Sequence, residues 1–84
     1  MTYRFVPLRE VEQYVPLAKS LGVSEVARSA RGFVTAYRRA GRPEKLSERW
    51  IRKRHGFVAR HLVQYSQHPT PRRWLALVMW AYKP

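Results

Sequence analysis

Basic side chains at helical spacing are the groups in this sequence best suited to chemistry. They lie on the polar side of residues 47–66, opposite the apolar residues: Arg49, Arg52, Lys53 and Arg60. Guanidinium and ammonium groups donate charge-assisted hydrogen bonds to phosphate, so a row of them predicts contact with a nucleic-acid backbone. An ordinary solvated face is the alternative, but such faces mix charges because i,i+4 ion pairs stabilise a helix, and only Glu48 lies nearby.

A second basic row is expected in a helix over residues 29–41, with Ser29 as its N-cap and Gly41 as its stop. Its polar side carries Arg31, Thr35, Arg38 and Arg39. The two rows together predict a surface that follows a phosphate backbone and reads little base sequence. Such a surface does not separate DNA from RNA, and we favour DNA. A linker over residues 41–46 follows this helix.

Two arginines open the last predicted helix, which runs toward Lys83. Arg72 and Arg73 fall in its first turn, where the positive end of the helix dipole disfavours cations and favours anions. We therefore expect the pair to meet either a phosphate, which we favour, or a neutralising Glu such as Glu25 or Glu44.

Catalysis and metal binding have little support in the sequence. Arg54 and His61 lie one heptad apart on the apolar side of residues 47–66, where we expect them to reach the rim or to pair with a Glu and the backbone. The histidines lack metal-site spacing, and the chain has no Cys or Asp to complete a site. Phosphate-binding loops, HExxH motifs and usefully spaced acids are also missing. We expect no enzyme activity, no metal and no cofactor.

The charge balance points to an anionic partner. Seventeen Lys and Arg face five acids in 84 residues, which gives a net charge of +12. Self-repulsion of this size destabilises a small fold, so we expect a function that uses the charge. A GC-rich genome would explain the preference for Arg over Lys, but not the shortage of acids.

A protein-interaction module is the alternative function. It would dock on an acidic partner protein or form part of a larger assembly, and electrostatic steering would serve either role. Such a module exposes an apolar or aromatic centre with a charged rim. Trp50, Trp74 and Trp80 stand at core-like positions rather than at those of base-stacking platforms. Exposure of two or more of these rings and Tyr82 would favour the protein partner.

The composition predicts a single all-α domain over residues 1–84. A hydrophobic content of 45% suits a folded globule, and the lack of Cys fits a reducing compartment. No N-terminal run resembles a signal peptide, and the longest apolar run, residues 74–82, is far shorter than the ~20 residues that span a bilayer. We expect four to five short helices, with the apolar C-terminal helix at the centre and no membrane contact.

Local sequence signals predict where the first elements begin and end. Residues 2–6 alternate polar and apolar and predict a short extended arm. A helix follows, in which Pro16 is expected to divide two pieces or to lie in the first turn of the second. Gly22 suits the position after a helix end, and Ser24 suits the next N-cap.

The longest helix is expected from Ser47, its N-cap, to about Ser66. Leu46 and Ile51 stand at the positions of a hydrophobic staple. Gly56 lies on the charged side, where a mid-helix glycine costs about 1 kcal/mol against Ala. We therefore expect a close approach by another group at this glycine.

Residues 16–29, PLAKSLGVSEVARS, resemble the first half of a bacterial helix-turn-helix motif. The match is the run Ala-x-x-Leu-Gly-Val-Ser at residues 18–24. Arg28 stands where that motif has a buried aliphatic residue. The resemblance implies a base-reading face that begins near Ser24 and Glu25 and includes Arg28.

Three longer segments resemble pieces of small basic proteins of unknown function encoded by tailed phages and some bacteria: SARGFVTAYRRAG, LSERWIRKRHGFVARHL and PTPRRWLALVMWAYKP. This resemblance covers roughly residues 17–84. It implies a cytoplasmic setting in a bacterium or a phage-infected cell, but no activity and no functional residues.

Overall fold

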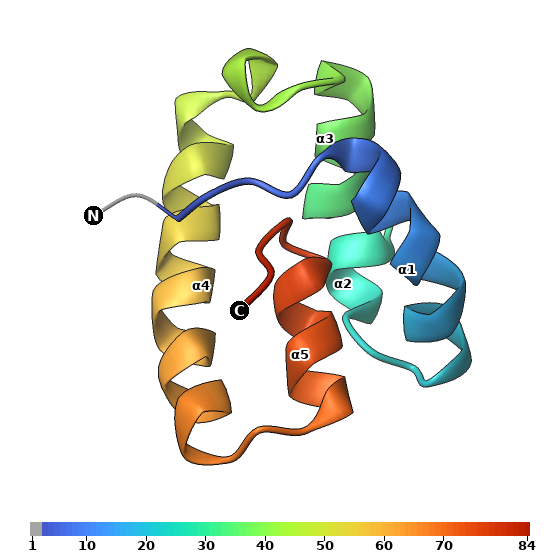
Figure 1. The fold of residues 1–84 in the computed structure, drawn as a ribbon. Helices are drawn as coiled ribbons and strands as arrows, with labels where there is room; N and C mark the ends of the chain where they lie inside the picture. The colour runs from blue at the N-terminus through green and yellow to red at the C-terminus, as the bar shows by residue number, and fades with distance from the viewer. Residues whose placement is uncertain (1–2) are drawn as a thin grey trace.

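The computed structural model describes residues 3–84, which form five α-helices and one turn of 3-10 helix and contain no strand (Figure 1). They are α1 (Leu8–Ser20), α2 (Glu25–Arg28), α3 (Phe33–Ala40), η1 (Pro43–Lys45), α4 (Glu48–Gln67) and α5 (Pro71–Val78). The predicted all-α fold is confirmed. No helix within residues 3–84 has the length and apolar character needed to cross a membrane.

Helix α5 lies at the centre, between α1 and α4 (Figure 1). It buries Leu75, Leu77 and Val78, and the turn after it buries Met79 and Ala81. Helices α1 and α3 add further buried residues to the core: Val11, Ala18, Phe33, Val34 and Tyr37. The predicted central position of the apolar C-terminal helix is confirmed.

The end of α1 follows its local sequence. Gly22 has a φ of 65°, in the left-handed region that favours glycine. Its N–H donates to the Lys19 carbonyl at 3.2 Å, and the Val23 N–H donates to the Ala18 carbonyl at 2.8 Å. This pair of bonds is a Schellman ending, which satisfies the last carbonyls of the helix.

Side-chain caps start α4 and α5 where the sequence predicts them. The Ser47 hydroxyl accepts from the Trp50 N–H at 3.3 Å, and the Thr70 hydroxyl accepts from the Arg73 N–H at 3.2 Å. Each cap satisfies one backbone N–H that has no partner within its own helix. The predicted end of α4 at Ser66 falls one residue short of the observed Gln67.

Pro16 does not divide the first helix. It lies inside the continuous α1, and its side chain is exposed. Packing of α1 against α3 and α5 holds the helix together across it. Ser24 precedes α2 as predicted, but its side chain makes no capping hydrogen bond.

Helix α3 begins at Phe33, four residues later than Ser29, the predicted N-cap. Ser29 instead ends α2, where its hydroxyl donates to the Val26 carbonyl at 2.6 Å. The chain then passes so close to α2 that a Cβ at Gly32 would lie 2.1 Å from the Val26 carbonyl oxygen. This close packing of the two segments delays the helix. Its predicted stop at Gly41 is confirmed.

Helix α5 ends at Val78 rather than near Lys83. The Ala81 N–H donates to the Val78 carbonyl at 2.8 Å and closes a turn in which Ala81 has a φ of 60°. The turn brings the Ala81 carbonyl to the Val6 N–H, at 2.8 Å. Residues 3–7 form the described part of the N-terminal arm, and Thr2 lies outside the described residues.

Candidate nucleic-acid interface

Helix α4 divides its cations between two sides of the helix. Arg54 is only 3% exposed, whereas the other four are exposed: Arg49, Arg52, Lys53 and Arg60. Arg49, Lys53 and Arg60 follow one line along the helix, because their spacings are close to whole numbers of turns. At 1.5 Å per residue this line, the α4 row, is about 16 Å long.

The α4 row has no internal counter-charge. Among residues 3–84, none of the ion pairs involves Arg49, Lys53 or Arg60. The Lys53 ammonium lies 5.2 Å from the centroid of the Trp50 ring, a cation–π contact. Arg52 lies 3.7 Å from Glu48, but both side chains are largely exposed, so this pair contributes little. The row therefore presents its full positive charge to solvent.

Gly56 lies in the middle of the α4 row. A Cβ at this position would meet only the guanidinium of Arg60, at 3.3 Å. No other element within residues 3–84 approaches it, so the close approach that the sequence suggests is made within the helix. The glycine lets the Arg60 guanidinium lie back along the helix surface, toward Lys53.

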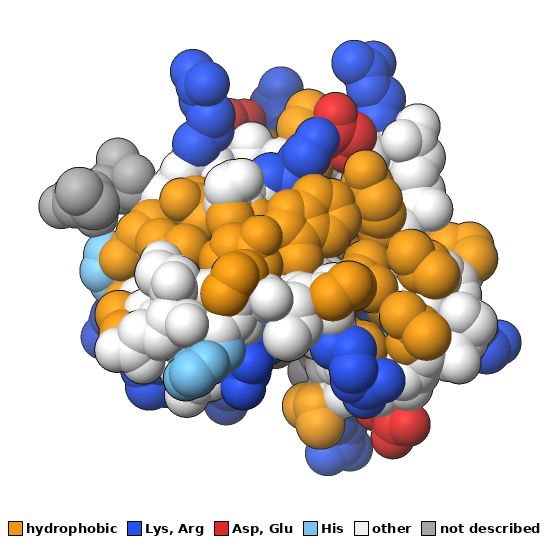
Figure 2. All heavy atoms as spheres, turned by 60° about the horizontal axis from the view of Figure 1, so that its bottom comes forward, with side chains coloured by type: hydrophobic (Ala, Val, Ile, Leu, Met, Phe, Trp, Pro, Cys, Tyr) orange, Lys and Arg blue, Asp and Glu red, His pale blue; other side chains and the backbone are white. Residues whose placement is uncertain are grey.

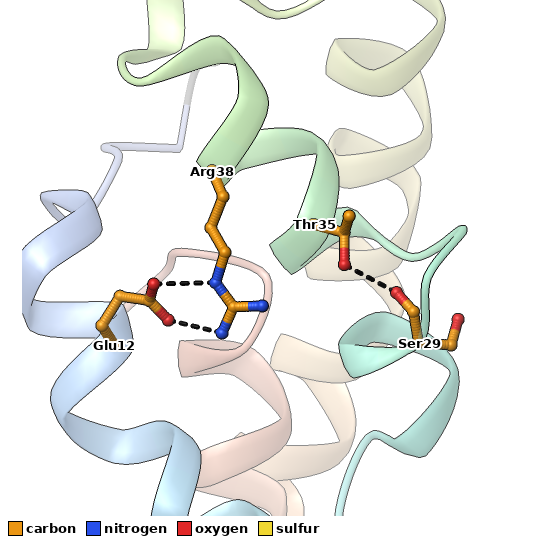
Figure 3. A network of polar contacts seen from close by, with 4 residues as sticks. All are labelled: Glu12, Ser29, Thr35 and Arg38. Atoms are coloured by element: carbon orange, nitrogen blue, oxygen red, sulfur yellow. Dashed lines mark hydrogen bonds and ion pairs between the residues drawn. The ribbon is translucent and has the colours of Figure 1, made fainter.

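The second predicted row, on α3, is not formed as a row. Arg31 is exposed in the turn before α3 rather than on its polar face. Arg38 donates from Nε and Nη2 to both carboxylate oxygens of Glu12 on α1, at 2.7 and 2.6 Å (Figure 3). Thr35 donates to the Ser29 carbonyl at 2.7 Å (Figure 3). The polar side of α3 thus binds α1 through Arg38 and the preceding turn through Thr35.

The Arg38–Glu12 pair changes the titration of both side chains. The hydrogen bonds from Arg38 lower the pKa of Glu12 below its ordinary value of 4.5, and the same bonds raise the pKa of Arg38. Arg38 is thereby neutralised within the fold. It belongs to the scaffold rather than to the predicted phosphate-binding face.

Arg39 keeps a place beside α4. Together with Lys45 and Trp50 it lines a hollow of about 310 Å³ between the end of α3 and the start of α4. The Trp50 ring also contacts the ammonium of Lys53, so Arg39 and Lys45 extend the α4 row at its N-terminal end. Lys45 was not predicted as a binding residue, because it lies in the predicted linker. The structure shows that this linker contains η1.

Arg72 and Arg73 bind backbone carbonyls rather than a Glu. Arg72 Nη1 donates to the Leu21 carbonyl at 2.5 Å, and Arg73 Nη1 donates to the His68 carbonyl at 2.9 Å. Leu21 and His68 are the C-caps of α1 and α4. The two cations at the positive end of α5 therefore lie at the negative ends of two other helices, which favours them. Of the two predicted partners, the neutralising Glu is wrong, because none of the ion pairs among residues 3–84 involves Arg72 or Arg73. The phosphate stays a prediction.

Arg54 is buried, and no carboxylate among residues 3–84 pairs with it. Its guanidinium donates to four backbone carbonyl oxygens: Trp80 (2.8 Å), Tyr3 (3.0 Å), Arg4 (3.1 Å) and Ala81 (2.8 Å). It also lies 3.6 Å from the centroid of the Phe5 ring. Burial lowers the pKa of Arg54 to about 10, so the group keeps its charge at neutral pH. The expectation of a rim position or a Glu partner is wrong, because Arg54 joins the N-terminal arm and the C-terminal turn to α4.

The helix-turn-helix-like segment forms the end of α1, the turn at Gly22 and α2. Helix α2 has four residues, which is a single turn, and Arg28 Nε donates to the Val23 carbonyl at 2.9 Å. Arg28, which was expected on the base-reading face together with Ser24 and Glu25, is thus bound within the segment.

No protein-family model, curated protein or solved structure matches this chain. The resemblances to the helix-turn-helix motif and to small basic phage and bacterial proteins therefore stay predictions. The candidate site depends on geometry and charge alone.

The aromatic residues are used mainly inside the fold. His61 stacks on Phe57 at 3.9 Å between centroids, Phe57 stacks on Trp80 at 4.6 Å, and Trp80 stacks on Phe33 at 5.0 Å. Burial, with Arg60 nearby, lowers the pKa of His61. The remaining candidate rings, Trp50, Trp74 and Tyr82, are half-buried like Trp80. The exposed aromatic centre that would favour a protein partner is not found at these rings.

Proposed function

We propose that this protein binds nucleic acid through the phosphate backbone, with the outer face of α4 as the main contact surface. The observation that carries the proposal is the α4 row, whose three exposed cations have no carboxylate partner within the described chain. Four of the five Glu pair with cations elsewhere, namely Glu10 with Lys83, Glu12 with Arg38, Glu44 with Arg42 and Glu48 with Arg52. The charge of the row is thus left for an external anion.

The mechanism is counterion release combined with charge-assisted hydrogen bonds. A row of about 16 Å spans the axial rise of about five phosphates of one strand. Arg39 and Lys45, beside the start of α4, lengthen the surface. Guanidinium and ammonium contacts of this kind position a protein on nucleic acid and carry little sequence information. DNA is the first polymer to test, with RNA as its alternative.

Binding to short duplex DNA and to RNA across a salt series tests this proposal. We expect log Kobs to fall linearly with log salt, with a slope of about −0.9 for each phosphate contact on duplex DNA. In a variant with Arg49, Lys53 and Arg60 replaced by Ala, the slope becomes shallower by about 0.9 for each phosphate that the variant no longer neutralises.

The matched control removes the same charge elsewhere. Arg4, Arg9 and Lys19 are exposed and take part in none of the described ion pairs. Their replacement by Ala should leave the slope close to that of the wild type. An equal change of slope in both variants would show that only net charge matters, and no binding to either polymer at about 50 mM salt would overturn the proposal.

A further inference from the structure

An open apolar groove lies between the end of α1, the turn from α4 to α5, and the start of α5. Its volume is about 540 Å³. The lining is almost wholly hydrophobic: Leu17, Leu21, Tyr65, Pro69, Pro71 and Trp74. Figure 2 shows hydrophobic side chains gathered in a continuous band over this face, with Lys and Arg along its border.

The exposure of this groove is unusual for its residue types. Leu17 is 48% exposed and Leu21 is 40% exposed, although α1 buries Val11 and Ala18 completely. Single exposed leucines are common, but three segments of the chain contribute to one contiguous apolar surface here. A contiguous exposed apolar surface of this kind is a candidate interaction site.

The rim of the groove is cationic. Arg72 is bound to the carbonyl of Leu21, which lines the groove, and Arg73 is bound to the carbonyl of His68, next to the lining residue Pro69. Both side chains are exposed, and neither takes part in an ion pair among residues 3–84. A partner suited to this groove places apolar side chains on the floor and acidic side chains beside the two guanidiniums, which have no ion-pair partner of their own.

We infer that this groove binds a short amphipathic segment of a partner protein, with apolar side chains on the floor and Asp or Glu beside Arg72 and Arg73. A second copy of this chain fits poorly, since a two-fold interface would set the same cationic rims against each other. A nucleic-acid backbone would meet Arg72 and Arg73 but would leave the apolar floor uncovered, because a phosphate over that floor would lose water without gaining a partner. The groove is therefore a second surface, separate from the α4 row.

Selection from a displayed random-peptide library on the full chain tests this inference. We expect enriched peptides to combine aliphatic or aromatic anchors with Asp or Glu. A synthetic peptide of the enriched sequence should shift backbone amide signals at Leu17, Leu21 and Trp74 in NMR spectra. Its affinity should fall about tenfold or more for Leu17→Ser, and should also fall when its own Asp and Glu become Asn and Gln.

Two control variants locate the binding. Val26→Ser removes a hydrophobic side chain that is 80% exposed and does not line the groove, so it should bind the peptide as the wild type does. The Ala variant of the α4 row should also bind as the wild type does.

Three outcomes would overturn the inference. The first is an enriched peptide whose affinity is the same for Leu17→Ser and the wild type, and the second is selection of no peptide at all. The third is dimerisation of the chain in sedimentation experiments that Leu17→Ser abolishes, since a second copy would then occupy the groove.

Discussion

At the residue scale, Arg54 is a buried cation whose partners are carbonyl dipoles instead of carboxylates. A carbonyl oxygen carries only part of a charge, so several are needed to replace the water that a guanidinium loses on burial. The four carbonyls around Arg54 fill this role, and no buried side-chain nitrogen or oxygen in the described residues is left without a hydrogen bond. The carbonyls belong to two segments that lie outside the helices, the N-terminal arm and the turn after α5.

Arg54→Met should destabilise the fold by about 3–5 kcal/mol. The methionine keeps an apolar stem but removes the donor to the carbonyls of Trp80, Tyr3 and Arg4, whereas the Ala81 carbonyl keeps the Val6 N–H. Each unsatisfied buried group is costly. Arg52→Met, the same change on the exposed side of α4, should stay within about 0.5 kcal/mol of the wild type. Urea unfolding measures both variants, and similar midpoints for the two would contradict the role given to Arg54.

Loss of Arg54 should also free the Val6 amide, which donates to the Ala81 carbonyl. Its hydrogen exchange should accelerate more than exchange at the centre of α5.

The Glu12–Arg38 pair should contribute about 0.5–1 kcal/mol at neutral pH, since both side chains are partly exposed. The pKa of Glu12 is lower in the folded chain than its ordinary value of 4.5, so the unfolded chain takes up the proton first as the pH falls. The contribution is therefore present above about pH 4.5 and is lost as the pH falls through the lowered pKa.

A double-mutant cycle with Glu12→Gln and Arg38→Gln measures this coupling free energy. It should shrink as the pH falls below about 4.5 and through the lowered pKa of Glu12. A coupling that does not change with pH would show that the pair acts through packing.

The sequence predicted that Arg54 lies on the inner side of its helix, but it did not predict which groups bind the guanidinium. Helical periodicity gives the side on which a residue lies. The acceptors of Arg54 are carbonyls of irregular segments, and every residue has a carbonyl, so no residue type signals them. The same reason explains why the partners of Arg72 and Arg73 were missed. Both reach carbonyls at the ends of other helices, which only the tertiary arrangement brings near.

At the element scale, sequence succeeded where a helix end depends on its own side chains. Ser47, Thr70, Gly22 and Gly41 act within a few residues of themselves, so their types predict the starts of two helices and the ends of two others. Gly32 could not be interpreted in this way, because its role depends on the approach of α2 to α3. Ser29 was therefore predicted as the N-cap of α3, although in the structure it ends the preceding helix α2.

Gly32 and Gly56 should respond to Ala in opposite directions. A Cβ at Gly32 would overlap the Val26 carbonyl, so Gly32→Ala should cost about 2 kcal/mol or more. A Cβ at Gly56 would meet only the flexible end of Arg60, so Gly56→Ala should stabilise the fold by up to about 1 kcal/mol. Thermal unfolding of the two variants provides the comparison, and stabilisation by Gly32→Ala would contradict the packing of α2 against α3.

At the scale of the whole molecule, the charge of +12 opposes the fold that presents it. The core is small and the ion pairs are exposed or partly exposed, so electrostatic attraction within the chain compensates little of this repulsion. Composition alone showed this imbalance. The structure shows where the positive charges lie. Arg54 is buried, Arg38 is paired with Glu12, and Arg72 and Arg73 lie at the ends of other helices. The α4 row stays exposed to solvent.

Salt should therefore stabilise this protein. Raising NaCl from about 10 mM to about 1 M shortens the Debye length from about 30 Å to about 3 Å, which screens repulsion between distant cations. We expect the melting temperature to rise across this range. Arg9 and Lys19 are exposed and lie outside the described ion pairs, so the double variant with Gln at both positions should melt higher than the wild type at low salt and rise less with added salt. A melting temperature that falls as salt is added would show that local ion pairs outweigh the net charge.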